Sequence, residues 1–282
     1  MAGEIKLFPT EEDYSYALEK AGADKKRRYA RFTLSALSSI PWVGGFLSAV
    51  ATAGAEEDQA GINELQRQWL EEHRRKMDEL SLALGQIIFR LEELGELVHE
   101  RLEDPNYLAL VQQGFRVWDE ATTEEKRSLV RTLLTNAAGT KLCSDDLVRL
   151  FLEWIDHYHE AHFAVIREIH KEPGSTRAEI WDAIYGRQVR EDSAEADLFK
   201  LLIRDLSTGS VIRQHRETTH DGQFVKRQTR RRVASPVLKS AFDNQEPYEL
   251  TELGSQFVHY AMQVPVSRLG SAPDSEDKNP DA

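Results

Sequence analysis

Thiol chemistry is almost absent from this 282-residue chain, whose one cysteine is Cys143. A disulfide framework and a cysteine-based zinc site are therefore excluded, which fits a reducing compartment. The first residues, MAGEIKLFPTEEDYSY, are acidic and lack an apolar core, so we expect no secretory signal and a cytoplasmic location. No histidine signature accompanies Cys143, so we interpret it as a passive residue.

Positive charge is also scarce. The chain holds 36 Lys and Arg against 48 Asp and Glu, a formal net charge of -12. A protein this acidic does not coat nucleic acid over its whole surface, although a local basic patch can still bind phosphates. The sequence also lacks a phosphate-binding glycine loop, a G-x-S-x-G turn and a cysteine–histidine zinc spacing. We therefore expect a protein that is not an enzyme and uses no cofactor or metal.

Charge disappears altogether from residues 32–55, although 30% of the chain is charged. Pro41 and the Gly44–Gly45 pair interrupt this stretch. It is either one kinked span of about 20 residues, enough to cross a bilayer, or two short helices in a hairpin. The basic cluster at residues 25–31 suits the cytoplasmic flank of a membrane segment, whereas many Ser and Thr residues make insertion marginal. Both interpretations stay open, and the candidate membrane-contact residues are Ile40, Pro41, Trp42, Val43, Phe46 and Leu47.

Apolar residues recur at heptad spacing further along the chain, and residues 56–102 contain no proline. This predicts a long amphipathic helix over 56–104, ended by the sequence EDPN, with more helices over 107–155. Its apolar seam either pairs with another chain or is covered by helices of the same chain. The candidate oligomerisation residues are Leu70, Met77, Leu80, Leu84, Ile87, Leu91 and Leu94, with Val98 continuing the seam and His73 as its one polar member.

Residues 156–263 have a different pattern, in which three helices precede two strands. The helices are HYHEAHFAVIREIHKE, STRAEIWDAIYG and DSAEADLFKLLIRDLSTG, and the strands are SVIRQHRET and QFVKRQTRRRV around a THDG turn. Tyr248, Leu250, Thr251 and Gly254 follow as Y-x-L-T-x-x-G. This segment resembles the one after the wing in MarR- and PadR-like bacterial proteins, and the resemblance implies a winged helix-turn-helix. The tail at 264–282 has the composition of a disordered segment.

The predicted wing concentrates positive charge. Wings commonly contact phosphates or the minor groove of nucleic acid. The candidate contacts are Arg213, Arg216, Lys226, Arg227, Arg230, Arg231 and Arg232, with Lys200 and Arg204 on the preceding helix. Glu195 and Asp197 on that helix argue against base reading in the major groove. Nucleic-acid binding, protein docking and a solvated charged hairpin all stay open.

Five residues of metal-ligating types also lie close together, in the sequence DHYHEAH at 156–162. His159 and His162 have the spacing that places two ligands on one helix face. The sequence HEAH is one residue short of the H-E-x-x-H zinc pattern. We interpret the cluster as a solvated helix face.

Together these features predict a mainly α-helical protein of two parts, a helical module at 1–155 and a winged helix at 156–263. The layout of the first part resembles that of α-helical pore-forming proteins. The expected function is that of a non-enzymatic bacterial protein whose winged helix docks on nucleic acid or a partner, while the helical module oligomerises or engages a membrane. Stress and antiphage defence effectors share this modular logic. The alternatives are a dimeric DNA-binding transcriptional regulator and a protein–protein adaptor.

Overall fold

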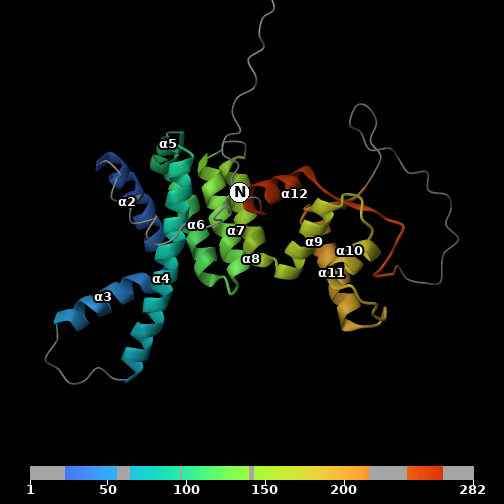
Figure 1. Ribbon diagram of the computed structural model, residues 1–282, viewed down its shortest axis with the longest axis horizontal. Coiled ribbons are helices and arrows are strands. Elements are labelled where there is room, and N and C mark those ends of the chain that lie inside the picture. The colour runs from blue at the N-terminus through green and yellow to red at the C-terminus, as the bar shows by residue number, and fades with distance from the viewer. Residues whose placement is uncertain (1–22, 56–63, 96, 140–142, 216–239, 263–282) are drawn as a thin grey trace, which may run out of the picture. The chain divides into compact units, whose positions relative to one another are not determined.

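The computed structural model describes residues 23–55, 64–95, 97–139, 143–215 and 240–262 (Figure 1). The fold is mainly helical, as the sequence predicts, with a small two-stranded antiparallel sheet. The chain divides into two compact units: unit 1 is residues 1–153 with 260–282, and unit 2 is residues 154–259. The division lies close to the expected one after residue 155. The tail at 264–282 is outside the described residues.

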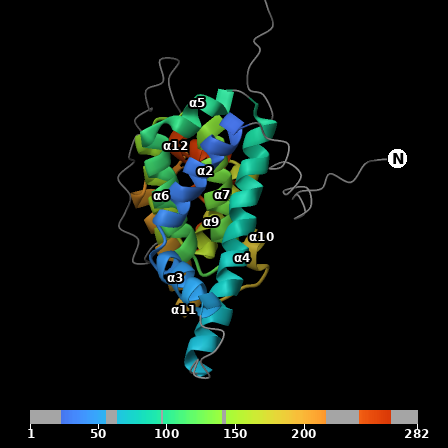
Figure 2. The ribbon, with the colours of Figure 1, turned by 90° about the vertical axis from the view of Figure 1, so that its left-hand side faces the viewer.

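Unit 1 is a helical bundle. Its helices are α2 (Ala23–Ser38), α3 (Pro41–Ala55), α4 (Glu64–Glu93), α5 (Leu97–Glu103), α6 (Pro105–Glu120), α7 (Glu124–Gly139) and the first part of α8 (Asp145–His157). Helix α2 packs on α6, α6 on α7 and α7 on α4, as Figure 2 shows. Leu80, Leu91, Phe115 and Leu133 are fully buried at these contacts. The apolar stripes that the sequence predicts therefore form one shared core.

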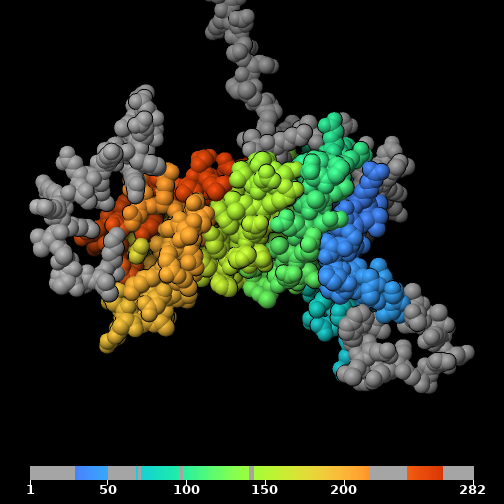
Figure 3. All heavy atoms as spheres, turned by 180° about the vertical axis from the view of Figure 1, so that it is seen from behind, coloured from blue at the N-terminus to red at the C-terminus, as the bar shows by residue number. Residues whose placement is uncertain are grey.

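The uncharged stretch forms two helices, because the chain bends by 99° between α2 and α3. Pro41 is the first residue of α3, where its missing N–H costs no helical hydrogen bond. Helix α2 begins at Ala23, so the basic cluster at 25–31 lies within this helix. Figure 3 shows α2 and α3, in blue, on one face of unit 1. In the described part of the chain, no single helix is long and apolar enough to span a membrane; only the bent pair qualifies by composition.

The prediction of one unbroken helix over 56–104 is wrong. Helix α4 ends at Glu93, and α5 begins at Leu97. Between them Gly95 has a φ of +77°, a left-handed conformation that ends helices and that glycine adopts freely. Leu91 and Val98 are both fully buried, so the heptad spacing continues across the break and conceals it. Residues 56–63 lie outside the described part.

Unit 2 contains the second half of the pattern. Its elements are α9 (Glu160–Lys171), α10 (Arg177–Tyr185), α11 (Ala194–Thr208), β1 (Ile212–Gln214), β2 (Tyr248–Leu250) and α12 (Glu252–Phe257). The π-helix η1 (Val258–Met262) follows, and its residues from Tyr260 on belong to unit 1. The capping box of Thr176 and Glu179 begins α10, as predicted. The second strand expected at 223–233 lies outside the described residues.

The two strands pair in antiparallel register, with Ile212 opposite Leu250 and Gln214 opposite Tyr248. Thr176, just before α10, forms an isolated bridge with Pro247 on the other side of β2. The segment Y-x-L-T-x-x-G thus contains strand β2 and the start of α12. Its sequence does not predict the strand. Strand β2 thus has β1, which follows α11, on one side and the residues just before α10 on the other.

The threonine and the glycine of that segment fix the end of the ladder. The backbone N–H of Thr251 donates to the carbonyl of Val211 at 3.0 Å, and the Thr251 hydroxyl accepts the N–H of Gly254 at 2.9 Å. A Cβ at Gly254 would lie 2.1 Å from the Val211 carbonyl oxygen. Glycine is therefore required here because two backbones approach too closely for a side chain.

Replacing Gly254 by alanine should destabilise unit 2 by about 1–3 kcal/mol, the usual cost of forcing an extra methyl into a packed site. Gly44→Ala is the control, since nothing lies within 4 Å of a Cβ at that position of α3. There the change should stabilise slightly, by up to about 1 kcal/mol. Denaturant unfolding of both variants measures the difference, and equal effects would contradict the close approach.

Candidate functional site

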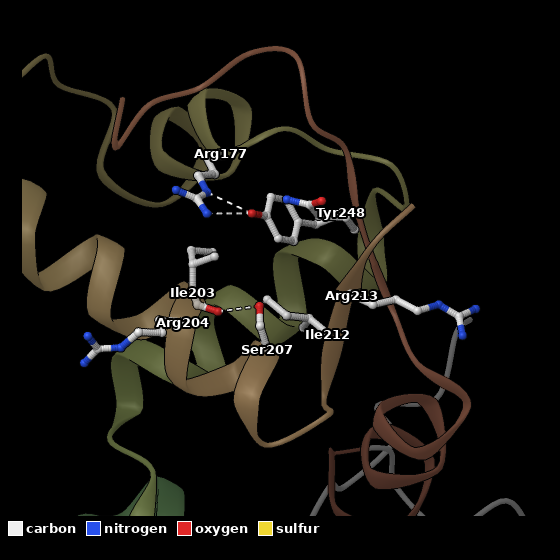
Figure 4. Close-up of a pocket in the computed structure, with 8 residues that line it drawn as sticks. Arg177, Ile203, Arg204, Ser207, Ile212, Arg213 and Tyr248 are labelled. Atoms are coloured by element: carbon white, nitrogen blue, oxygen red, sulfur yellow. Dashed lines mark hydrogen bonds between the residues drawn. The ribbon is translucent and has the colours of Figure 1, made fainter. Parts of the chain in front are cut away.

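A pocket of about 490 Å³ opens in unit 2 among α10, α11 and the two strands (Figure 4). Its volume lies within the range of about 300–1,000 Å³ that ligand pockets usually have. The described lining residues include three arginines and no acidic side chain. They are Arg177, Ile203, Arg204, Ser207, Ile212, Arg213, Gln214 and Tyr248.

Arg177 and Tyr248 form the polar end of this pocket, as Figure 4 shows. The Nε and Nη2 groups of Arg177 both donate to the Tyr248 hydroxyl, at 2.9 and 2.7 Å. The tyrosine ring itself is buried. Within the described residues no carboxylate lies at ion-pairing distance from Arg177.

The two predicted cations Arg204 and Arg213 also line the pocket, but their guanidinium groups point away from it in Figure 4. Arg213 donates from Nε to Glu249 at 2.7 Å, and the ring of His215 contacts the other oxygen of Glu249 at 2.6 Å. Burial raises the pKa of Glu249, but the bonds from His215 and Arg213 outweigh it and lower that pKa overall. Arg204 is 72% exposed and lies 3.7 Å from Asp205.

The outer face of α11 is poorly suited to reading bases. Lys200, another predicted contact, lies 3.5 Å from Asp197. Leu198 and Leu201 are 49% and 38% exposed on the same helix, and Glu195 is exposed as predicted. Paired charges and leucines do not offer the free donors that contact base edges.

The remaining predicted cations lie outside the described residues. They are Arg216, Lys226, Arg227, Arg230, Arg231 and Arg232. The segment that carries them begins immediately after His215, whose N–H donates to the Pro247 carbonyl at 2.8 Å. Because Gln214 and Tyr248 line the pocket and face each other in the ladder, the residues that directly precede this basic segment in the sequence lie beside the pocket.

The prediction of a solvated histidine cluster is wrong for His162, which is 4% exposed. Its Nδ1 accepts the backbone N–H of His159 at 3.1 Å, and its ring stacks on Tyr158 with centroids 4.9 Å apart. Nε2 lies 3.9 Å from the Asp205 carboxylate. Among the described residues, no group of three or more His, Cys, Asp or Glu side chains is arranged to hold a metal ion. His162 caps α9 instead.

The six candidate membrane-contact residues differ in how far their side chains are exposed. Ile40, Val43 and Phe46 are buried in unit 1, at 2%, 3% and 7% exposure. Trp42 donates from Nε1 to Asp119 on α6 at 2.9 Å and meets the ring of His73 edge to face. Pro41 and Leu47 are exposed. Lipid contact through the buried set would therefore require α3 to leave the bundle.

The heptad seam is covered largely by the same chain. Leu80, Leu84, Ile87 and Leu91 are buried within unit 1, against neighbours that include α7. Met77 and Leu94 are partly exposed, and the side chain of Leu70 lies outside the described part. This favours the intramolecular bundle of the two interpretations. Oligomerisation through the four buried leucine and isoleucine residues would require unit 1 to open.

Cys143 is buried in unit 1. Burial raises the pKa of its thiol, and this effect exceeds the opposing hydrogen bond with Tyr260. Because the thiolate is the nucleophilic form, a raised pKa lowers the reactivity of this residue.

Comparisons of the chain with models of known protein families, with curated proteins and with solved structures found no match. The site is thus defined by its geometry. Sequence reasoning identified Tyr248 only as part of a fold motif and missed Arg177, which lies 71 residues away. The capping box at Thr176 was the one signal near Arg177, since it places that arginine at the first position of α10.

The stability of unit 2 should depend on the protonation of His162. Burial lowers the pKa of His162 below its usual value of about 6.5, outweighing the opposing effect of Asp205. The unfolded chain therefore binds this proton more readily, so the stabilisation is complete above about pH 6.5 and is lost as the pH falls through the folded-state pKa.

The variant His162→Gln should flatten this decline, because glutamine is a usual capping-box residue with an uncharged acceptor. His157→Gln, at an exposed position at the end of α8, is the matched control. Thermal unfolding between pH 7.5 and 5 measures the effect. A decline of the same size in all three proteins would show that His162 does not cause it.

Proposed function

We propose that this protein is a non-enzymatic, two-part binding protein of the cytoplasm whose unit 2 is a winged helix-turn-helix that contacts the phosphate backbone of nucleic acid. The order α9, α10, α11, β1, β2 supports this fold, and residues 216–239, which separate β1 from β2 in the sequence, would supply the wing. The bridge between Thr176 and Pro247 adds a third short strand position next to β2, before α10.

One observation carries the proposal: Gln214, just before the basic segment in the sequence, lies in a surface lined by arginines. Residues 216–239 contain seven Lys and Arg residues and two Asp and Glu residues. Arg213, which precedes them in the sequence, and Arg204 both line this surface. Cations concentrated in this way bind phosphates even when the whole protein is acidic.

The exposed side chains of α11 indicate which part of the nucleic acid unit 2 would contact. The leucines and paired charges of this helix do not match the donor and acceptor pattern of base edges, whereas arginines beside the ladder suit phosphates. The proposed contact is therefore with the backbone, with little preference for sequence. It needs no pairing through the α4 seam, which distinguishes it from the dimeric transcriptional regulator.

Changing Arg230, Arg231 and Arg232 together to glutamine should weaken duplex DNA binding and make it less dependent on salt. The slope of log affinity against log salt should fall in magnitude by about 2–3, since each lost phosphate contact removes about 0.9. The matched control changes three consecutive cations of α4, Arg74, Arg75 and Lys76, to glutamine. Fluorescence anisotropy at several salt concentrations measures both. Binding that is absent, or that both triple variants reduce equally, would refute the proposal.

A second candidate function is supported by the outer face of α3. This helix carries no charged residue, and Leu47 is 52% exposed beside the exposed Gly44 and Gly45. Leu34 on α2 is 65% exposed. The basic cluster at 25–31 in α2 complements anionic headgroups. We propose that unit 1 binds an anionic membrane surface through this face while Ile40, Val43 and Phe46 stay in the core.

The variant Leu47→Asp should abolish flotation of the protein with vesicles of mixed neutral and anionic lipid. Leu82→Asp is the matched control, because Leu82 is 50% exposed on α4. Both variants should keep the unfolding temperature of the wild type, since neither leucine is buried. This surface is excluded as a membrane contact if the wild type does not float, or if Leu82→Asp loses flotation as completely as Leu47→Asp.

A further inference from the structure

We propose that the pocket bounded by Arg177 and Tyr248 binds a phosphate group carried by a small molecule of about nucleotide size. This goes beyond backbone binding by the wing, since it assigns a defined ligand site to residues that the sequence did not mark. The argument rests on the hydrogen-bond donors at the pocket, on the charge of its lining and on its size.

The donors of Arg177 and Tyr248 outnumber the acceptors around them. The guanidinium group presents two parallel N–H groups, a geometry that matches two oxygens of a phosphate. Here both converge on one neutral oxygen, the Tyr248 hydroxyl. Because that hydroxyl accepts two bonds, its own hydrogen points elsewhere, and no acceptor for it lies among the described residues. An acceptor-rich anion would take up these donors.

The charge of the lining selects the kind of anion. Among the described residues, three arginines and no carboxylate line the pocket. Arg204 and Arg213 extend outward at the rim, each with one acidic neighbour, while Arg177 has none in the described part of the chain. A phosphate monoester has three terminal oxygens and up to two negative charges, so it engages more of these donors than a carboxylate does.

The remaining volume indicates what accompanies the phosphate. A pocket of about 490 Å³ is much larger than one phosphate ion. Ile203 and Ile212 form an apolar part of the wall, and the Ser207 hydroxyl beside them already donates to the Ile203 carbonyl at 2.7 Å. A nucleoside-sized body would fit within this volume. The phosphate itself can come from a free mononucleotide or from the end of a nucleic-acid strand, and the experiment separates these sources.

The experiment is calorimetric titration of the full chain with adenosine 5′-monophosphate, inorganic phosphate and adenosine, at matched ionic strength. The monophosphate should bind most tightly, inorganic phosphate more weakly and adenosine not at all. Arg177→Gln should weaken monophosphate binding at least about tenfold, as expected for loss of charge-assisted hydrogen bonds. Tyr248→Phe retains the buried ring and should cause a smaller loss. Arg190→Gln, at an exposed arginine bonded to Asp192 outside the pocket, should have no effect.

A parallel titration with a short duplex, with and without a 5′-phosphate, separates the two proposals. If the duplex does not bind but the monophosphate does, the pocket is confirmed and backbone binding by the wing fails. If the duplex binds to wild type and Arg177→Gln equally, and the monophosphate does not bind, the pocket proposal is overturned. Equal binding of adenosine and its monophosphate also overturns it, because the phosphate would then contribute nothing. Tighter binding of only the phosphorylated duplex identifies a strand end as the source.

Discussion

The carbonyl of Val211 is the point on which the arrangement of unit 2 depends. It accepts the backbone N–H of Thr251 at 3.0 Å and lies against Gly254, where a side chain would not fit. This contact sets the register in which Gln214 faces Tyr248. A shift of one residue would turn every strand side chain to the opposite face and remove the tyrosine hydroxyl from Arg177. The pocket thus exists because one carbonyl holds the strand end and the start of α12 together.

The same contact explains why part of the site was visible in the sequence and part was not. Thr251 meets a local requirement because it caps α12, and the capping box at Thr176 is local as well. Tyr248 and Gly254 stand out in the sequence only as members of the same short motif. Arg177 contributes through a partner 71 residues away, and no short pattern encodes such a pair. The break at Gly95 was hidden for a related reason. Leu91 and Val98, on either side of the break, are both buried and keep the heptad spacing. The left-handed conformation of Gly95 between them changes only the backbone.

The uncharged stretch shows a second limit of sequence patterns. A helix face that packs on a protein core and one that contacts lipid both require the removal of charge, so composition alone does not separate them. In unit 1, α3 has one buried and one exposed side. Ile40, Val43 and Phe46 face the core, and Leu47 faces outward. Trp42 suits a membrane interface by its chemistry, but here its indole N–H is satisfied by Asp119 at 2.9 Å. Only the position of Asp119 in the fold shows that Trp42 has a hydrogen-bond partner within the protein.

The acidity of the whole chain constrains both binding proposals in the same way. With a net charge of -12, the protein repels a long polyanion except where cations lie within about one Debye length, roughly 8 Å at physiological salt. On the described surface of unit 2 several cations are paired, including Lys200 with Asp197 and Arg213 with Glu249. In the proposed function, nucleic acid would therefore gain its contacts mainly at the basic segment, and its affinity should depend on few phosphates. A small phosphate ligand avoids most of this repulsion because it fits within the screening distance of Arg177. The electrostatics thus favour a compact anion in the pocket over extended coating of the surface.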